Sequence, residues 1–357
     1  MAIDVFGLGN TLVDIQTFID DKLLKKLKIT KGIMTLIDEK QSREVLTAIA
    51  DLKTKYVPGG SCGNSISMIA MMGGKTTYTG VVADDMYGRL YENKISERGV
   101  KSMLRFTDSG LTGTAIVLTS PDAERTMLTH LGVCGEFTKS DLNMEVLSDS
   151  AVFHTTGYEF DTPSQKEALI EAMKIMKKNG KKVSFDIADP FCIERNRDEL
   201  KAVISEYVDI LFGNYEEVKI LTGCEDPIEA GKQIRAMGPS ICLVKVGGNG
   251  SYAFFDDTYV QVPVYQAEKV LDSTGCGDIY AGGFLYGYTS GYGIEKSAHI
   301  ASYLASKIIA VAGVALEKFD MEEIKSFINE KILNSSTIFL YMIKKVFCFF
   351  ATPSFFK

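Results

Sequence analysis

The chain has 357 residues, 46% of them apolar, and a formal net charge of −7 at pH 7. This size suits one large domain, or one domain with a small addition, and the mixture of acids and bases along the chain argues against a nucleic-acid partner held through phosphate contacts. The seven cysteines form no C-x-x-C pair and the three histidines lie far apart, so a zinc site is not expected.

The N-terminus and the cysteines indicate the compartment. Residues 1–7 have no basic region and lead directly into an apolar stretch, unlike a signal peptide. Cysteines kept reduced in a cell are commonly buried as small apolar residues. We therefore expect a cytoplasmic protein.

The first stretch predicts a buried strand followed by polar residues. Residues 3–8 are apolar or β-branched, and Gly9 ends the run. Leu12 stands where the third glycine of a dinucleotide fingerprint belongs, which disfavours an oxidoreductase. Asn10 and Asp14 come just past the strand, where open α/β sheets bind ligands, although both could equally form an Asx turn.

A small second sheet, a candidate lid, is predicted from residues of about 12–38 and 102–131. Polar and apolar residues alternate over 14–20 and 32–37, and short strand-like runs lie at 103–107, 113–119 and 125–130. Between them, residues 39–52 are expected to form a helix with an apolar stripe at Val45, Ile49 and Leu52. Arg125 could close over phosphates if this sheet moves, or it could be a solvated strand residue.

A glycine-rich stretch precedes the next apolar helix. Gly59 and Gly60 permit the close approach of a ligand to the backbone. Asn64 is expected to open a helix rich in Met and Ile that ends at Met72. Its amide could cap that helix or point at a hydroxyl ligand.

From residue 140 strands and helices alternate regularly. Predicted strands at 151–154, 182–187, 210–212 and 241–246 alternate with helices at 164–178, 197–206, 216–221 and 228–237, and a strand at 258–264 and helices at 295–311 and 321–331 follow. This order predicts parallel βαβ units. Polar residues at the strand ends, namely Asp186, Asp189, Asn214, Glu217 and Lys245, would then line one rim.

Two of these rim stretches have competing readings. Asn214 and Glu217 have the spacing of a helix capping box, and Glu217 could also help hold hydrated Mg²⁺ near phosphates. The turn that contains Gly247 and Gly250 could be a plain hairpin or a shelf for the phosphates or sugar of a nucleotide.

The stretch 272–278 combines a glycine-rich turn with an acid. Gly275 and Gly277 flank Cys276, and Asp278 begins an apolar helix-like run. A glycine-rich turn at a helix start makes an anion site. Asp278 could therefore meet a substrate hydroxyl beside a phosphoryl group, or it could be a helix N-cap. Its position at a helix start leads us to expect a lowered pKa.

The last 23 residues, 335–357, differ in composition from the rest. Seven of them are Phe or Tyr, none is acidic, and Lys344 and Lys345 interrupt the apolar run, so a transmembrane helix is not expected. This tail could lie on a membrane surface or pack on the body, and the domain proper is expected to span residues 1–334.

Three motifs resemble the ribokinase-type (phosphofructokinase-B) family of sugar and nucleoside kinases. They are Gly59-Gly60 with Asn64, Asn214-x-x-Glu217, and Asp272-x-Thr274-Gly275-Cys276-Gly277-Asp278. The resemblance runs from about residue 2 to about 330, and residues 9–14 and 121–127 resemble the adenosine-kinase branch most. It implies an α/β fold of three layers around a parallel sheet, with a small β-sheet lid.

The resemblance also implies a role for each matching position. Asp278 would be the catalytic base, beside an anion hole made by the amides of Gly275, Cys276 and Gly277. The acceptor would bind to Asn10, Asp14, Gly59, Gly60 and Asn64. ATP would bind to Asn214, Lys245, Gly247, Gly250 and Arg125, with Mg²⁺ held by Glu217 through water. Cys276 stands where the family usually has Ala, and its thiol adds oxidant sensitivity if it is exposed.

The implied activity is an ATP-dependent kinase that phosphorylates the 5′-hydroxyl of a ribonucleoside, adenosine first. A kinase for free ribose or fructose, and a nucleotide-binding regulator without catalysis, are the alternatives. ATP and Mg²⁺ are the expected cofactors, and the family allows a monovalent cation near the anion hole. The expected partner is a small nucleoside or sugar, without nucleic acid or membrane, and the protein would be a monomer or a homodimer.

Overall fold

The computed structural model describes residues 2–122 and 124–334. The aromatic-rich tail, residues 335–357, lies outside the described residues, so its prediction stays untested. Within the described part of the chain, no helix has the length and apolar content that crossing a membrane requires.

A nine-stranded sheet forms the centre of the molecule, in the order β16-β15-β14-β13-β12-β11-β1-β5-β7. The strands from β7 to β14 are parallel, and only β15 and β16 run antiparallel to their neighbours. The strands are β1 (Ile3–Leu8), β5 (Thr76–Thr79), β7 (Lys101–Ser102), β11 (Ser150–Thr156), β12 (Lys182–Asp186), β13 (Ile210–Asn214), β14 (Ile241–Lys245), β15 (Ser251–Phe255) and β16 (Thr258–Val262).

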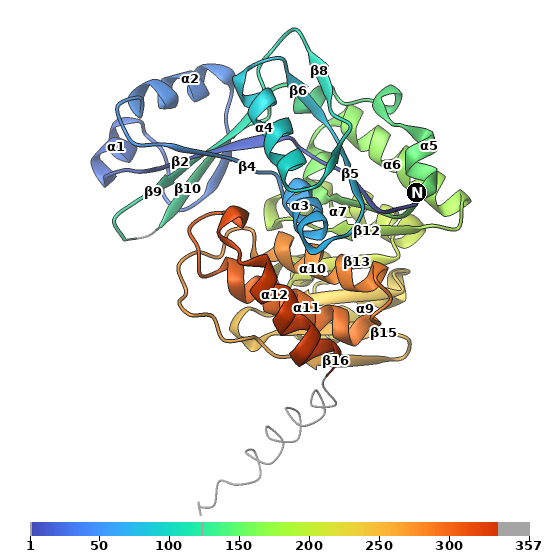
Figure 1. Ribbon diagram of the computed structural model, residues 1–357. Coiled ribbons are helices and arrows are strands. Elements are labelled where there is room, and N and C mark those ends of the chain that lie inside the picture. Colours follow the sequence, from blue (N-terminus) through green and yellow to red (C-terminus); the bar gives the residue numbers. More distant parts are fainter. Residues whose placement is uncertain (1, 123, 335–357) are drawn as a thin grey trace, which may run out of the picture.

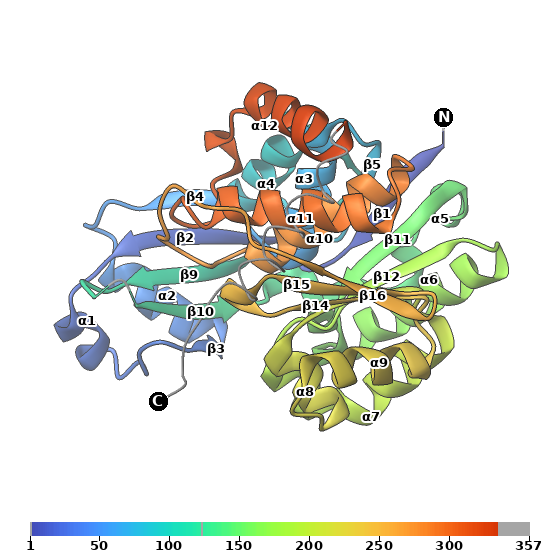
Figure 2. The same cartoon turned by 90° about the horizontal axis from the view of Figure 1, so that it is seen from below.

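Helices cover both faces of this sheet (Figures 1 and 2). One face carries α3 (Ser61–Met72), α4 (Met86–Glu97), α10 (Cys276–Thr289), α11 (Ile294–Ile308) and α12 (Met321–Phe327), the last continued by a π-helical turn (Ile328–Leu333). The other carries α5 (Met144–Asp149), α6 (Pro163–Lys178), α7 (Pro190–Tyr207), α8 (Tyr215–Thr222) and α9 (Pro227–Met237). The successive side chains of β1 divide between two separate cores, with Val5 packed under the first set and Phe6 under the second. The predicted three-layer α/β fold is confirmed.

A second, five-stranded sheet projects from one side of this body, in the order β3-β10-β9-β2-β4. Its strands are β2 (Leu12–Phe18), β3 (Met34–Leu36), β4 (Lys55–Pro58), β9 (Gly113–Thr119) and β10 (Arg125–His130). The helices α1 (Asp21–Lys26) and α2 (Glu39–Ala48) pack on one face, where Ile15, Ile116 and Leu128 meet Val45. The candidate site lies on the side of the opposite face of this sheet.

The structure corrects four sequence predictions. The run 103–107 does not join the second sheet, because the chain bends at Gly80 and β8 (Arg105–Thr107) pairs instead with β6 (Val81–Ala83). Leu52 is 37% exposed, since α2 ends at Ala48. Helix α7 begins at Pro190 rather than at residue 197, with a kink at Asn196. Finally, α3 begins at Ser61 rather than at Asn64.

Short 3₁₀ turns complete the chain. They are η1 (Gly132–Glu136), η2 (Lys139–Asp141), η3 (Gly157–Asp161), η4 (Gly247–Asn249) and η5 (Leu316–Lys318). Two of them matter for the site, because η3 follows the carboxyl end of β11 and η4 forms the glycine turn between β14 and β15.

Candidate active site

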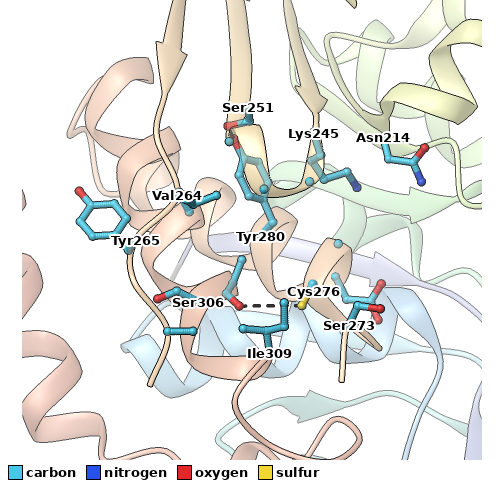
Figure 3. Close-up of a pocket in the computed structure, with 18 of the residues that line it drawn as sticks. Asn214, Lys245, Ser251, Val264, Tyr265, Ser273, Cys276, Tyr280, Ser306 and Ile309 are labelled. Carbon is cyan, nitrogen blue, oxygen red and sulfur yellow. Dashed lines mark hydrogen bonds between the residues drawn. The ribbon is translucent and has the colours of Figure 1, made fainter. Parts of the chain in front are cut away.

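A cavity of about 760 Å³ opens where the carboxyl ends of the central strands face the start of α10 (Figure 3). Asp186, Asn214 and Lys245 are the last residues of β12, β13 and β14, and all three line it. Parallel neighbouring strands bring their carboxyl ends to one edge, so most of the rim predicted from the sequence is formed. Asp189 is the exception, because it caps α7 by accepting a hydrogen bond from the N–H of Cys192 at 2.8 Å. Gly247 and Gly250 lie in the same wall.

The opposite end of the cavity is mainly apolar (Figure 3). Val264, Val270, Ala305 and Ile309 line it. The hydroxyls of two serines in the wall are engaged internally, since Ser302 donates to the carbonyl of Pro263 and Ser306 to that of Tyr303, both at 2.7 Å. This end suits a flat, largely apolar group such as a nucleotide base.

The start of α10 faces the polar end of the cavity. Gly275, the N-cap residue, has φ of 73°, in the left-handed region that favours glycine, and a Cβ there would lie 2.5 Å from Val314. The first N–H groups of a helix have no partner within it and carry partial positive charge. Lys245 adds a full positive charge beside these N–H groups. Its Nζ lies 3.1 Å from the position that a Cβ on Gly277 would take. The arrangement is an anion site.

One of the predicted anion-hole amides is engaged in this conformation. The N–H of Cys276 donates to the carbonyl of Ser273 at 3.1 Å, which leaves the following amides of the first helical turn for an anion. The thiol of Cys276 lies 3.8 Å from the carbonyl of Ala305, and burial raises its pKa to about 12. A thiol with such a pKa is protonated and poorly reactive at neutral pH.

Asp278 is bound by α3, and it does not cap its own helix. Its Oδ1 accepts a hydrogen bond from the hydroxyl of Ser61, and its Oδ2 accepts one from Nδ2 of Asn64 at 2.8 Å. The hydroxyl of Ser65 donates to its backbone carbonyl at 2.8 Å. The N-cap reading of Asp278 is therefore wrong, because Gly275 is the N-cap and Asp278 lies in the first turn. Asn64 is likewise no cap, since it lies inside α3.

The expected lowering of the Asp278 pKa is also wrong. Asp278 opens onto the cavity but lies deep in the protein, and the loss of solvation raises its pKa. Its hydrogen bonds from Ser61 and Asn64 favour the charged form and only partly offset burial. The carboxylate is therefore more basic than an ordinary aspartate.

The remaining predicted acceptor residues gather beside Asp278, outside the wall of the main cavity. A Cβ on Gly59 would lie 2.1 Å from Oδ1 of Asp14, and one on Gly60, whose φ is 81°, would lie 2.2 Å from the carbonyl oxygen of Asn10. Only glycine fits such contacts. Burial raises the pKa of Asp14 to about 7, with Arg125 opposing the rise and Asp278 adding to it.

Two buried residues that the sequence did not single out hold Asn10. Its backbone N–H donates to Oε1 of Glu159 at 3.1 Å, and its Oδ1 accepts from Nε2 of Gln165 at 2.9 Å. Both partners are 1% exposed, and burial raises the pKa of Glu159 to about 7. These contacts, and the place of Asp14 inside β2, exclude the Asx-turn reading. Glu159 also has the spacing of a capping box with Thr156, which the structure forms, but no local sequence signal points to the contact of either partner with Asn10, since each meets Asn10 only through the fold.

Arg125 joins the second sheet to the loop before the anion site. Its Nη1 forms an ion pair with Oδ1 of Asp272 at 2.7 Å and also donates to the hydroxyl of Thr274. The side chains of Arg125 and Asp272 are only 17% and 7% exposed, so the reading of Arg125 as a solvated strand residue is wrong.

Asn214 and Glu217 form the predicted capping box. Oδ1 of Asn214 accepts from the N–H of Glu217 at 2.9 Å, and Oε2 of Glu217 accepts from the N–H of Asn214 at 2.7 Å. Burial raises the pKa of Glu217, with Lys245 opposing this, and Lys245 pairs with Asp186 at 3.2 Å.

The acidic side chains near the rim are the candidate protein ligands of Mg²⁺. Among the described residues no group of three or more His, Cys, Asp or Glu side chains could hold a metal ion. The donors present, Glu217 and Asp186, fit Mg²⁺ bound chiefly by the phosphates of a ligand and by water, which is a common arrangement for this ion.

Comparisons with known proteins find nucleoside kinases and sugar kinases among the relatives of this chain. The sequence pattern described as pfkB family carbohydrate kinase matches residues 28–318. An adenosine kinase from Dictyostelium discoideum is 26% identical over 88% of this chain and 96% of its own length. A 5-dehydro-2-deoxygluconokinase from Clostridium perfringens is 27% identical over 78% of this chain and 85% of its own length.

Solved structures show the same division between nucleoside and sugar kinases. The adenosine kinase from Sinorhizobium meliloti superposes with a TM-score of 0.81 at 32% identity, over 88% of this chain and 96% of that one. A probable sugar kinase from Rhizobium etli superposes with a TM-score of 0.82, also at 32% identity, over 88% and 95% of the two chains.

The hydrogen bonds to Asp278 predict how its acidity changes on mutation. Asn64→Ala removes a donor that favours the carboxylate, so the pKa of Asp278 should rise further. A ¹³C titration of the carboxyl carbons measures this, with Asp278→Asn assigning the signal. Ser67→Ala, which changes the same helix without touching the carboxylate, should leave the titration unchanged. An unshifted titration in Asn64→Ala would contradict the assignment of this hydrogen bond.

Proposed function

The chain belongs to the pfkB family of carbohydrate kinases, and on that premise we propose that it transfers the γ-phosphoryl group of ATP to the 5′-hydroxyl of a ribonucleoside, adenosine first. That it is an ATP-dependent kinase for a sugar or nucleoside follows from the family and from its kinase relatives. The family does not decide between a nucleoside and a sugar as the acceptor, so the proposal of a nucleoside depends on the geometry of the site.

ATP fits the cavity in one orientation. Its base takes the apolar end between Val264 and Ile309, and its phosphates follow the rim past Asn214 and the turn of Gly247 and Gly250. The γ-phosphoryl group then reaches Lys245 and the free amides at the start of α10. Mg²⁺, when bound, neutralises phosphate charge beside Glu217.

The acceptor hydroxyl attacks from the side of α3. Its oxygen forms a bond to the γ-phosphorus while the bond to the β-phosphate oxygen breaks, its proton passes to a carboxylate oxygen of Asp278, and ADP leaves. The amides of α10 and Lys245 stabilise charge on the transferring oxygens. A base is most effective with a pKa near the working pH, so the raised pKa of Asp278 suits this role.

The observation that carries the nucleoside assignment is an apolar surface on the face of the second sheet that also carries Asp14. Ile15, Ile116 and Leu128 point toward α2, so the residues that alternate with them point toward the site. The strand registers therefore place Met127, Met34 and Leu36 on the same side as Asp14 and Arg125.

This surface is open. Leu36 is 47% exposed, and Met34 and Met127 are half-buried. A nucleoside base would cover these side chains while its ribose hydroxyls reach Asp14 and Asn10, whereas a free sugar would leave them in water.

An acidic sugar fits less well. A gluconate-type acceptor carries a carboxylate, which Asp14 would repel when ionised, and the nearby Arg125 is already paired with Asp272. Asp278, the other acid at the acceptor position, would add to this repulsion when ionised.

The direct test is ADP release with ATP, Mg²⁺ and a panel of acceptors. We expect turnover with adenosine, with kcat/KM well above that for ribose, fructose or 5-dehydro-2-deoxygluconate. Turnover of a free sugar but not of adenosine would overturn the nucleoside assignment. No turnover with any acceptor would contradict the kinase activity itself.

Asp278→Asn tests the base. The amide cannot take the proton, so kcat should fall by roughly 10²–10⁴, while ATP binding measured by calorimetry should be largely retained because the α10 amides remain. Turnover near the wild-type rate would show that Asp278 is not the base.

Met127→Ser tests the apolar surface. Losing its contact with the base should raise KM for adenosine by roughly 10-fold or more, since removing apolar contacts in a pocket costs about 1–3 kcal/mol. KM for ATP should not change. Ile33→Ser, an exposed apolar residue just before β3, serves as the matched control and should leave both constants near wild type. Equal effects of the two substitutions on adenosine would count against a base-binding surface.

A further inference from the structure

The hydroxyl of Ser61 takes the place of an acceptor. We propose that Ser61 occupies the position on Asp278 that the substrate hydroxyl takes during transfer, and that it keeps water away from the base until an acceptor displaces it. Ser61 would thus make the enzyme select substrate hydroxyls over water. This inference rests on the proposed role of Asp278 as the base, but it does not depend on which acceptor is phosphorylated.

The two oxygens of the Asp278 carboxylate differ in their surroundings. Asn64, which holds Oδ2, is 4% exposed and lies outside the wall of the cavity. Ser61, which holds Oδ1, lines the cavity. The oxygen that a group in the cavity would reach is therefore the one that Ser61 already occupies.

The local backbone fixes Ser61 in this place. It is the first residue of α3, directly after Gly60, whose positive φ sets the entry of the chain into the helix. A hydroxyl on the first turn of a packed helix is close to its partner at all times, so its effective concentration at Oδ1 is high. An isolated water molecule has no such advantage.

An acceptor can displace Ser61 where water cannot. Exchanging one O–H···O⁻ hydrogen bond for another changes the free energy little. An acceptor gains further contacts to Asp14 and Asn10 that hold its hydroxyl at Asp278, whereas a single water gains none. The base is thus exposed to a hydroxyl only when an acceptor is bound.

The side reaction that Ser61 prevents is ATP hydrolysis. In it, a water oxygen bonds to the γ-phosphorus, the bond to the β-phosphate oxygen breaks, one water proton passes to Asp278, and the products are ADP and inorganic phosphate. The phosphate-binding groups that serve the kinase would serve this reaction equally. The occupant of Oδ1 is therefore what decides whether the base serves transfer or hydrolysis.

The test is ATP hydrolysis without any acceptor, measured as phosphate release with ATP and Mg²⁺. In Ser61→Ala the space of the hydroxyl admits water at the base, so hydrolysis should rise about tenfold or more, up to the roughly 10²–10⁴ that a positioned base contributes. Ser61→Thr keeps a hydroxyl and should stay near the wild-type rate. The double variant Ser61→Ala/Asp278→Asn should lose the added hydrolysis.

Ser65→Ala is the matched control. It removes a hydrogen bond from the same helix to the same residue, but at the backbone carbonyl rather than at the carboxylate. Its hydrolysis rate should match wild type. Thermal melting of all variants verifies that each is folded.

Three results would overturn the proposal. They are unchanged hydrolysis in folded Ser61→Ala, an equal rise in Ser65→Ala, and phosphate found on Ser61 by mass spectrometry after incubation with ATP, since the last would make Ser61 an acceptor. These measurements need no nucleoside. A failure of this proposal can therefore be told apart from a failure of the acceptor panel.

Discussion

The contact between α3 and α10 at Asp278 is the feature on which the rest of the site depends. The two helices come from residues more than two hundred positions apart and meet closely because α10 has glycines at the crossing; a Cβ on Gly282 would lie 2.7 Å from the carbonyl oxygen of Ser65. This closeness lets Ser61 and Asn64 reach the Asp278 carboxylate. The strand ends form the rim proposed for the phosphates on one side of that point, and the second sheet forms the surface proposed for the acceptor on the other.

Much of this arrangement was predictable because its signals are local. The βαβ alternation after residue 140, the glycine turn before Asp278 and the capping box of Asn214 and Glu217 each lie within a short window of sequence. The order of the elements then brings the strand ends to one edge, since parallel strands joined by right-handed crossovers have no other arrangement.

The parts that escaped prediction depend on contacts between distant residues. Gln165 holds Asn10 across 155 positions and Arg125 meets Asp272 across 147, and neither pair has a sequence signature. The predicted direction of the Asp278 pKa shift was wrong for a related reason. Desolvation by the surrounding layers outweighs the hydrogen bonds from Ser61 and Asn64 that favour the carboxylate, and burial is a property of the whole fold.

The ion pair of Arg125 and Asp272 has a consequence for the timing of the reaction cycle. It fastens the second sheet to the loop that leads into α10, and both side chains are mostly shielded from water, so salt screens their attraction only weakly. Any movement of the second sheet away from this loop must therefore separate the pair. Where the release of a phosphorylated product depends on such a movement, an arginine on the rim of a sheet helps to set the residence time of that product without touching it.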